Sequence, residues 1–320
     1  MEFRILGSFE VLGVDGVLDL RGAKRRELLA CLVVHAGEPM STDRLVEELW
    51  GDGGSNGAAR TVQTYLSQLR RLLRGKGASL QTRPGGYVLE VDAAAVDAHR
   101  FRQGMTIAGT ETDPARRLTV LDEALGLWRG APLVEFAGAG WAEREARRLE
   151  DLQLEALHRR CDTLLELDRP ADAVAELEDL VAAHPLEERF WAQLMLALYR
   201  TGRQADALGA YQRARRHLVD EMGIEPGPEL VDLEHRILGH DPTLVVRSEP
   251  QRMAMGRGPV VTFLFTDMEE STRLWADFPD AMPGALERHD ALLDEAVEGH
   301  AGTVAKRTGD GVLAVFSEAS

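Results

Sequence analysis

Residues 58–74, AARTVQTYLSQLRRLLR, form the stretch that decides the fold of the first part of this chain. The apolar residues Val62, Leu66, Leu69 and Leu73 recur every three or four positions, which predicts one buried face of an α-helix. The opposite face carries arginines, amides and hydroxyls and no acidic residue. Such a face suits an anionic partner, although a helix of this kind taken alone is more often an ordinary solvated surface.

The charge of the chain is unevenly distributed. The 320 residues carry a formal net charge of -16, yet residues 1–100 contain 13 Lys and Arg and 13 Asp and Glu. No acidic residue occurs between Asp52 and Glu90, so the basic helix lies in an acid-free window. The net charge would repel a polyanion, so any nucleic-acid binding must come from a local patch on the first domain.

The segments around this helix predict an α+β winged helix. In chain order, we expect strands at 3–7, 9–12 and 17–20, helices at 24–36, 43–50 and 58–74, and a β-hairpin of strands 80–82 and 87–91. Ser41 or Thr42 is expected to cap the second helix. Two helices joined by a short loop and followed by a hairpin are typical of a helix-turn-helix with a wing.

The side chains of the third helix and the wing predict how DNA would be bound. Gln68 and Thr64 suit hydrogen bonds to base edges in the major groove. Other side chains suit phosphates, which position a protein without reading sequence, and Arg83 at the hairpin tip could enter the minor groove. The expected DNA-contacting residues are Arg60, Thr61, Gln63, Thr64, Tyr65, Ser67, Gln68, Arg70, Arg71 and Arg83.

From residue 97 onward the pattern is helical and contains an internal repeat. The segment 169–173, RPADA, recurs as RQADA at 203–207, an offset of 34 residues. This period is typical of tetratricopeptide repeats, in which each helix pair covers the apolar face of its neighbour. The sequence therefore predicts an all-α repeat domain with an acidic surface.

Aromatic residues, histidines and cysteines in these helices are expected to be structural. Trp128, Trp141 and Trp191 are expected to pack between helices rather than to contact a partner. His158, His184 and His217 show no metal-ligand spacing and are expected to be structural or solvated. The two cysteines, Cys31 and Cys161, lie in apolar helical contexts and are expected to be buried free thiols.

The C-terminal segment has a different pattern. Residues 244–258 are expected to be a linker, followed by a strand at 260–265, a helix, and a hairpin at 305–316 whose turn is Gly-Asp-Gly. Asp267 ends the strand and Asp310 lies in the turn, and two such carboxylates could converge on Mg²⁺. Each aspartate alone also fits a structural role, Asp267 as a helix cap and Asp310 as a turn residue.

Two groups of motifs resemble known bacterial domains. STDRLVEELWG (41–51), RTVQTYLSQLRRLL (60–73) and TRPGGYVLEV (82–91) together resemble the OmpR-type winged helix of the SARP (antibiotic regulatory protein) activators. ALGLWRG (124–130) and GIEPGPEL (223–230) look like the bacterial transcriptional activation domain that follows it. No receiver domain precedes residue 1, so control is expected to come from the C-terminal side.

This resemblance implies a sequence-specific DNA-binding transcriptional activator. Such a protein would bind repeats in double-stranded promoter DNA, contact RNA polymerase and control secondary-metabolite genes. The family habit implies a homodimer or a larger assembly on DNA, and no cofactor is required for DNA binding. A purely scaffolding repeat protein is the alternative that uses the same fold without DNA.

The C-terminal segment resembles part of an enzyme. FTDMEESTRLW (265–275) and AKRTGDGVLAVF (305–316) look like the first third of a class III nucleotidyl cyclase. The resemblance implies that Asp267 and Asp310 hold Mg²⁺ and that Lys306 contacts the purine of ATP. Because the later catalytic segments are not present before Ser320, we expect no cyclase activity from this chain. The alternative is a regulatory N-terminal part of a longer cyclase that converts ATP to cyclic AMP.

The predicted organisation is therefore multidomain. It comprises a winged helix at 1–96, an all-α tetratricopeptide-like activation domain at 97–243, a linker at 244–258 and a truncated α/β cyclase-like segment at 259–320. No apolar run is long enough to span a membrane and no secretory signal is visible. A cytoplasmic location is expected, with association with the nucleoid when the protein is bound to DNA.

Overall fold

The computed structural model describes residues 1–14, 16–51, 57–245, 262–266, 275, 278–279, 281–300, 302–307 and 312–316. It divides into two compact units, Met1–Arg247 and Ser248–Ser320, and each is described by itself. Within the described residues, no helix is both long enough and apolar enough to cross a membrane.

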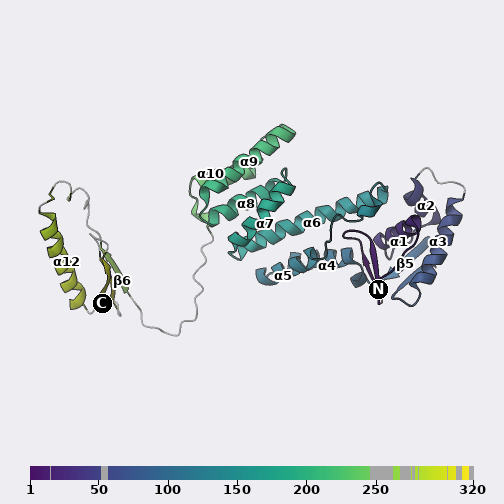
Figure 1. The fold of residues 1–320 in the computed structure, drawn as a ribbon, viewed down its shortest axis with the longest axis horizontal. Helices are drawn as coiled ribbons and strands as arrows, with labels where there is room; N and C mark the ends of the chain where they lie inside the picture. The colour runs from purple at the N-terminus through teal and green to yellow at the C-terminus, as the bar shows by residue number, and fades with distance from the viewer. Residues whose placement is uncertain are drawn as a thin grey trace. The chain divides into compact units, whose positions relative to one another are not determined.

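The first unit begins with the predicted winged helix. Its elements are β1 (Glu2–Arg4), β2 (Glu10–Gly13), β3 (Gly16–Val17), α1 (Ala23–Val34), α2 (Thr42–Trp50), α3 (Ala58–Leu73), β4 (Ala78–Arg83) and β5 (Gly86–Val91). The first three strands form an antiparallel sheet in the order β1-β2-β3, and β4 pairs with β5 as the wing. Helix α3 lies on the side of this domain that is turned away from the helices that follow (Figure 1).

The wing is joined to the loop before α2 through one glycine. Met40 and Tyr87 exchange two backbone hydrogen bonds, at 2.9 and 2.8 Å. Gly86 precedes Tyr87 with φ 140°, and a Cβ added there would lie 2.0 Å from the carbonyl oxygen of Met40. Only glycine permits this close approach of two backbones.

Strand β1 is shorter than predicted because other elements take its hydrogen-bonding partners. The backbone N–H groups of Ile5 and Leu6 donate to the carboxylate of Asp97, at 2.8 and 3.1 Å. The backbone N–H groups of Arg129 and Leu133 donate to the carbonyl oxygens of Leu6 and Ile5, at 2.9 and 3.0 Å. These atoms are satisfied without a strand partner, so the ladder ends at Arg4.

The helical part of the first unit contains the predicted repeat domain. Its elements are η2 (Ala93–Ala95), α4 (Asp97–Thr110), α5 (Pro114–Leu125), η3 (Val134–Phe136), α6 (Gly140–Glu166), α7 (Pro170–Ala183), α8 (Glu188–Arg200), α9 (Gln204–Met222), α10 (Pro228–Leu238) and η4 (Pro242–Leu244). Figure 1 shows α6 running from the winged helix to the stacked helices α7 to α10.

The 34-residue repeat is confirmed in atomic detail. Arg169 precedes α7 and pairs with Asp172 at 2.6 Å, and Arg203 precedes α9 and pairs with Asp206 at 2.7 Å. The backbone N–H groups of the two arginines donate to carbonyls five residues earlier, both at 2.9 Å. The two helix pairs therefore begin with the same turn and the same ion pair.

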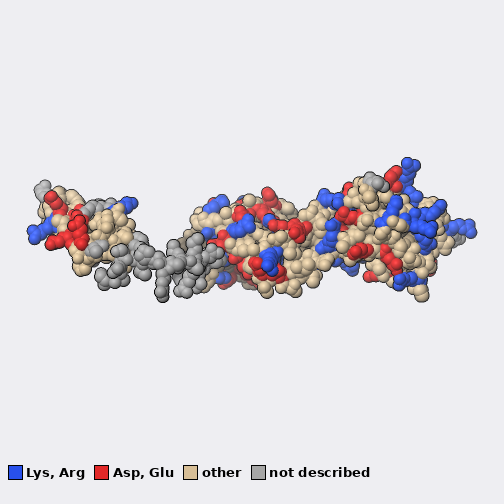
Figure 2. Space-filling view, turned by 90° about the horizontal axis from the view of Figure 1, so that it is seen from below, with Lys and Arg blue, Asp and Glu red and all other residues tan. Residues whose placement is uncertain are grey.

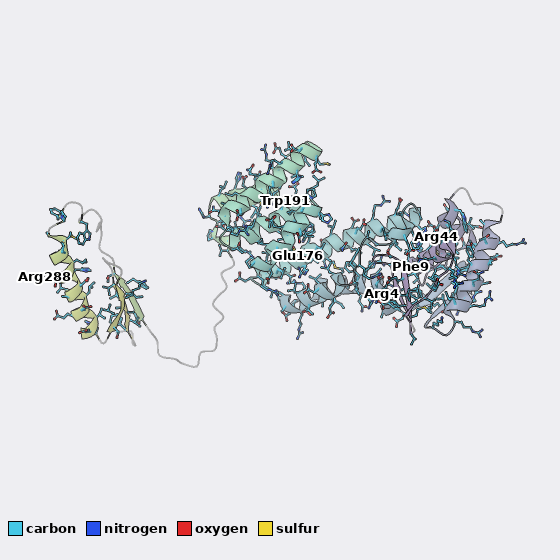
Figure 3. The ribbon with its side chains drawn as sticks, in the orientation of Figure 1. Arg4, Phe9, Arg44, Glu176, Trp191 and Arg288 are labelled. Carbon is cyan, nitrogen blue, oxygen red and sulfur yellow. The ribbon has the colours of Figure 1, made fainter. Side chains whose placement is uncertain are left out.

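The winged helix and the first activation-domain helices share one hydrophobic core. Buried residues from Phe3 to Ala156 form a single cluster that crosses the predicted boundary between residues 96 and 97. Phe9 of the N-terminal segment lies 6.0 Å from Phe136, which lies 5.7 Å from Trp141 of α6, measured between ring centroids. Figure 3 shows Phe9 at this junction. The two domains are therefore packed together and not merely joined in sequence.

A second cluster holds the repeat helices together. Trp191 of α8 is buried between the helices (Figure 3), where its indole N–H donates to the carbonyl oxygen of Pro185 at 2.8 Å. Trp141 is also buried, and Trp128 packs edge-on against Phe101 at 5.3 Å, so the packing role predicted for the tryptophans is confirmed. Cys31 and Cys161 are buried free cysteines, as predicted.

The C-terminal unit is described only in part. It contains β6 (Thr262–Thr266), α12 (Met282–Gly299), β7 (Gly302–Arg307) and β8 (Val312–Phe316), with the strands in the antiparallel order β6-β8-β7. The predicted strand and hairpin strands are confirmed. Both predicted metal ligands, Asp267 and Asp310, lie outside the described residues.

Candidate nucleic-acid interface

Helix α3 presents two contrasting faces. Ala58, Val62, Leu66, Leu69 and Leu73 are buried against the winged-helix core, as the apolar spacing predicted. The exposed stripe on the opposite side is formed by Arg60, Gln63, Thr64, Ser67, Arg71 and Arg74. Five of these residues follow the helical period along the centre of the outer face, and Gln63 lies at its edge.

The cations on this stripe are not neutralised by the protein. No carboxylate in the described parts of the chain forms an ion pair with Arg60, Arg71 or Arg74. Figure 2 shows Lys and Arg gathered at the winged-helix end of this unit with some Asp and Glu nearby, whereas acidic and basic side chains are mixed over the repeat helices. Unpaired arginines on an acid-free helix leave a local positive potential that attracts a polyanion.

Arg70 lies beside this stripe and is engaged by the wing. Its Nε donates to the carbonyl oxygen of Leu80 at 2.9 Å, and its Nη2 donates to Thr82 Oγ1 at 3.0 Å. These bonds hold β4 against α3. A guanidinium has five N–H donors, so Arg70 keeps donors for a phosphate, but two of its bonds serve the fold.

Arg83 lies at the wing tip, where the sequence placed it. Its backbone lies opposite Gly86 in the β4–β5 ladder, and its guanidinium forms an ion pair with Glu90 of β5. Glu90 is the acidic residue that ends the acid-free window. Entry of Arg83 into a minor groove would therefore require this exposed ion pair to be exchanged for contacts with DNA.

The hydroxyl groups of α3 are partly used within the helix. Thr61 donates to the carbonyl oxygen of Gly57 at 3.1 Å, and Thr64 donates to that of Arg60 at 3.0 Å. Their oxygens remain available as acceptors. Tyr65 and Gln68 are half-buried on one flank of α3, where Gln68 contacts Arg25 of α1.

Two features of the interface were not among the predicted contacts. Arg74 belongs to the exposed stripe and lines, with Ser67, Arg71 and Gln81, a groove of about 610 Å³ between α3 and β4. Arg25 of α1 donates to Gln68 Oε1 at 3.0 Å. No local pattern reveals the second contact, because the two residues are 43 positions apart.

The helix that precedes α3 begins as the sequence predicted. Ser41, rather than Thr42, is the N-cap of α2, and its hydroxyl accepts a hydrogen bond from the backbone N–H of Arg44 at 3.1 Å. Figure 3 labels Arg44 at this end of α2. Helix α3, which follows α2, is 16 residues long. The major groove of B-DNA is wide enough to admit an α-helix.

Comparison with family models agrees with this architecture. The model described as "Transcriptional regulatory protein, C terminal" matches residues 19–89, and the model described as "Bacterial transcriptional activator domain" matches residues 92–238. The transcriptional regulator RedD of Streptomyces coelicolor is 37% identical over 259 residues, which cover 78% of this chain and 73% of RedD. This chain belongs to the SARP family of transcriptional regulators.

Two further members show how far the likeness extends. The regulatory protein AfsR of Streptomyces griseus is 36% identical over 247 residues, 76% of this chain but only 25% of AfsR. The solved structure of Mycobacterium tuberculosis EmbR, in complex with a low-affinity phosphopeptide, matches with a TM-score of 0.71 and 32% identity, over 75% of this SARP chain and 65% of EmbR. The likeness therefore extends over about three quarters of this chain and over a smaller share of each of these two relatives.

Proposed function

We propose that this regulator binds double-stranded promoter DNA sequence-specifically by placing α3 in the major groove. The observation that carries the proposal is the exposed stripe of α3, whose arginines have no carboxylate partner among the described residues. The stripe supports a role for Arg60 and Arg71 at phosphates and for Gln63, Thr64 and Ser67 at base edges. Gln68 is half-buried beside the stripe, and it is proposed to reach a base edge as well. Thr61, Tyr65 and Arg70 lie beside the stripe on α3, and Arg83 at the wing tip completes the proposed interface.

The activation domain is proposed to connect the DNA-bound protein to RNA polymerase and to further copies of itself. The shared core supports this arrangement, because it transmits the orientation of the DNA-bound winged helix to α4 and α6. Two or more copies would then bind repeated sites near promoters of secondary-metabolite genes. The proposal keeps the predicted domain boundaries, which are 1–96, 97–243, 244–258 and 259–320.

Salt dependence of DNA binding by the full chain tests the phosphate contacts. The logarithm of the association constant is expected to fall with the logarithm of salt concentration by roughly 0.9 per neutralised phosphate. Arg71→Ala should reduce that slope by about one and weaken binding to all sequences alike. Arg116→Ala, on the exposed surface of α5, is the matched control. An unchanged slope for Arg71→Ala would remove the phosphate assignment.

A second proposal concerns the C-terminal unit. Thr266 of β6 pairs with Val312 of β8, so the strand that leads to Asp267 lies beside the strand that follows Asp310. Lys306 is exposed on β7, which pairs with β8. This topology supports a cyclase-like segment in which the two aspartates hold Mg²⁺ and Lys306 contacts a purine. The family matches end at residue 238, so only the motifs and this topology support it.

We expect this segment to have no cyclase activity in the present chain. Purified protein with ATP and Mg²⁺ or Mn²⁺ should yield no more cyclic nucleotide than the Asp267→Ala/Asp310→Ala double variant. Turnover above that control would show that the segment is an active cyclase and would overturn the expectation.

A further inference from the structure

The side chain of Gln68 is held by an arginine from another helix. Arg25 Nη1 of α1 donates to Gln68 Oε1 at 3.0 Å, and Arg25 Nη2 donates to the carbonyl oxygen of Arg21. The Nε atom of Arg25 is buried and has no hydrogen-bond partner within the described residues. The guanidinium is therefore wedged between α1 and α3, with both of its terminal nitrogens engaged.

The chemistry of the two groups fixes the orientation of the amide. A guanidinium has only donors, whereas a glutamine amide has an oxygen that accepts and an NH₂ group that donates. Gln68 must therefore turn its oxygen toward Arg25, and its NH₂ group is left for another partner. Reversing the amide would place two donors against each other and leave both without an acceptor.

This orientation matters for reading DNA. A freely rotating glutamine pairs with adenine by accepting from N6 and donating to N7. An amide whose oxygen is held by Arg25 offers chiefly its two N–H donors. Guanine presents two acceptors, N7 and O6, on its major-groove edge, whereas adenine presents one acceptor and one donor. A side chain that turns its N–H donors toward the base therefore matches guanine better than adenine.

We propose that Arg25 is a positioning residue that makes Gln68 a hydrogen-bond donor toward DNA, so that Gln68 selects guanine at one base pair. The proposal rests on the proposed binding of α3 in the major groove and adds a residue from α1 to the determinants of specificity. Arg25 acts through Gln68 and does not itself contact the base.

Three variants separate this role from a general contribution to folding. Arg25→Leu removes the donors but keeps an apolar side chain between α1 and α3, which frees the amide to rotate. Arg25→Lys keeps a donor-only group and should retain the orientation in part. Gln68→Glu strengthens the pairing with Arg25, because the acceptor becomes charged, but it presents no donor to DNA.

The test uses the full chain and a random pool of double-stranded DNA. Sequences bound by each variant are enriched, and affinities are then measured for sites that differ at one base pair. Arg25→Leu should reduce the preference for guanine over adenine at that position about 2- to 12-fold, the worth of one hydrogen bond, with other positions unchanged. Arg25→Lys should restore most of the preference, and Gln68→Glu should abolish it while the melting temperature is retained.

The outcomes distinguish this proposal from the one on which it rests. A wild-type protein that enriches no sequence would overturn the proposed function and this inference with it. A sequence that is enriched by wild type and bound with the same base preferences by Arg25→Leu would overturn only the inference. Uniform weakening at all positions in Arg25→Leu would assign Arg25 to the fold or to a phosphate and would also overturn it. If Arg25→Leu does not fold, Arg25→Lys and Gln68→Glu decide the question.

Discussion

Asp97, the first residue of α4, accepts a hydrogen bond from the backbone N–H of Ile5 at 2.8 Å, across 92 positions of sequence. The same carboxylate accepts from Leu6 at 3.1 Å and Ala98 at 2.8 Å, and it lies 3.4 Å from a terminal nitrogen of Arg129. It is almost fully buried, with 1% of its surface exposed. One side chain thus fastens the segment that directly follows β1 to the first helix of the activation domain.

Replacing Asp97 by asparagine should destabilise the first unit. Asparagine offers one acceptor where the carboxylate offers two, and its NH₂ group would face a backbone N–H. Leaving a buried donor unsatisfied costs about 1–3 kcal/mol, which chemical denaturation of the full chain would measure. Asp92→Asn is the matched control, because Asp92 is an exposed cap whose oxygen accepts from Ala94. Equal effects of the two substitutions would show that the buried carboxylate has no special role.

The two cysteines report whether the winged helix opens separately from the repeat helices. Burial raises the pKa of Cys31 and of Cys161 to about 12, so both thiols stay protonated at neutral pH. Because the thiolate is the nucleophile, neither should react with a thiol reagent until its surroundings unfold. Chains that keep one cysteine, through Cys161→Ala or Cys31→Ala, allow each to be followed alone.

Asp97→Asn should accelerate labelling of Cys31, which lies in the shared core, more than labelling of Cys161. The ratio of the two labelling rates in the variant, relative to wild type, is the measurement. Equal acceleration would mean that the whole unit unfolds as one, and no acceleration of Cys31 would contradict the role assigned to Asp97.

Gly86→Ala should disrupt the wing far more than Gly85→Ala. A Cβ at residue 86 would lie 2.0 Å from the Met40 carbonyl oxygen, which is backbone and cannot move aside cheaply. At residue 85 the nearest atom is Pro39 Cβ, at 3.7 Å, so alanine there meets only the strain of φ 96°. We expect a loss of about 1–2 kcal/mol for Gly85→Ala and a larger loss, with weaker DNA binding, for Gly86→Ala. Equal losses of unfolding free energy would contradict the Met40–Tyr87 link.

His158 should make the repeat domain less stable at mildly acid pH. Burial lowers its pKa below the ordinary value of 6.5, although the hydrogen bond with Gln193 opposes the shift. The unfolded state therefore binds more protons than the folded state below about pH 6.5, and stability falls as the pH falls from there. His158→Gln should flatten this acid limb, by at most about 1.4 kcal/mol per pH unit. If the free energy of unfolding fell equally with pH in wild type and in His158→Gln between pH 7 and 5, the role assigned to His158 would be contradicted.

Much of this fold could be predicted from sequence because its signals are local. The spacing of Val62, Leu66 and Leu69 predicted the buried face of α3, and the 34-residue offset predicted repeated helix pairs in the second domain. The extent of β1 could not be predicted, because the partners of Ile5 lie in α4 and in the loop near Leu133. Such contacts depend on the packed structure and leave no periodic pattern in the chain.

In the candidate site too, some features follow from local sequence patterns and others depend on the packed structure. The acid-free stripe of α3 follows from composition and helical period alone. The engagement of Arg70 by Leu80 and of Gln68 by Arg25 depends on how the wing and α1 pack against α3. Sequence patterns therefore predicted that Arg60, Thr64 and Arg71 face outward. They did not predict that Gln68 is half-buried beside α1, nor which donors the protein already uses.

The most direct test of the central claim is sequencing of the DNA that the full chain enriches from a random double-stranded pool. Wild type should enrich a defined motif, and a Gln63→Ala/Thr64→Ala variant, altered only on the exposed face of α3, should fold normally and lose preference at one or two base pairs of it. Enrichment of the same motif with the same preferences by both proteins, or of none by wild type, would contradict the assignment of α3 as the helix that reads DNA.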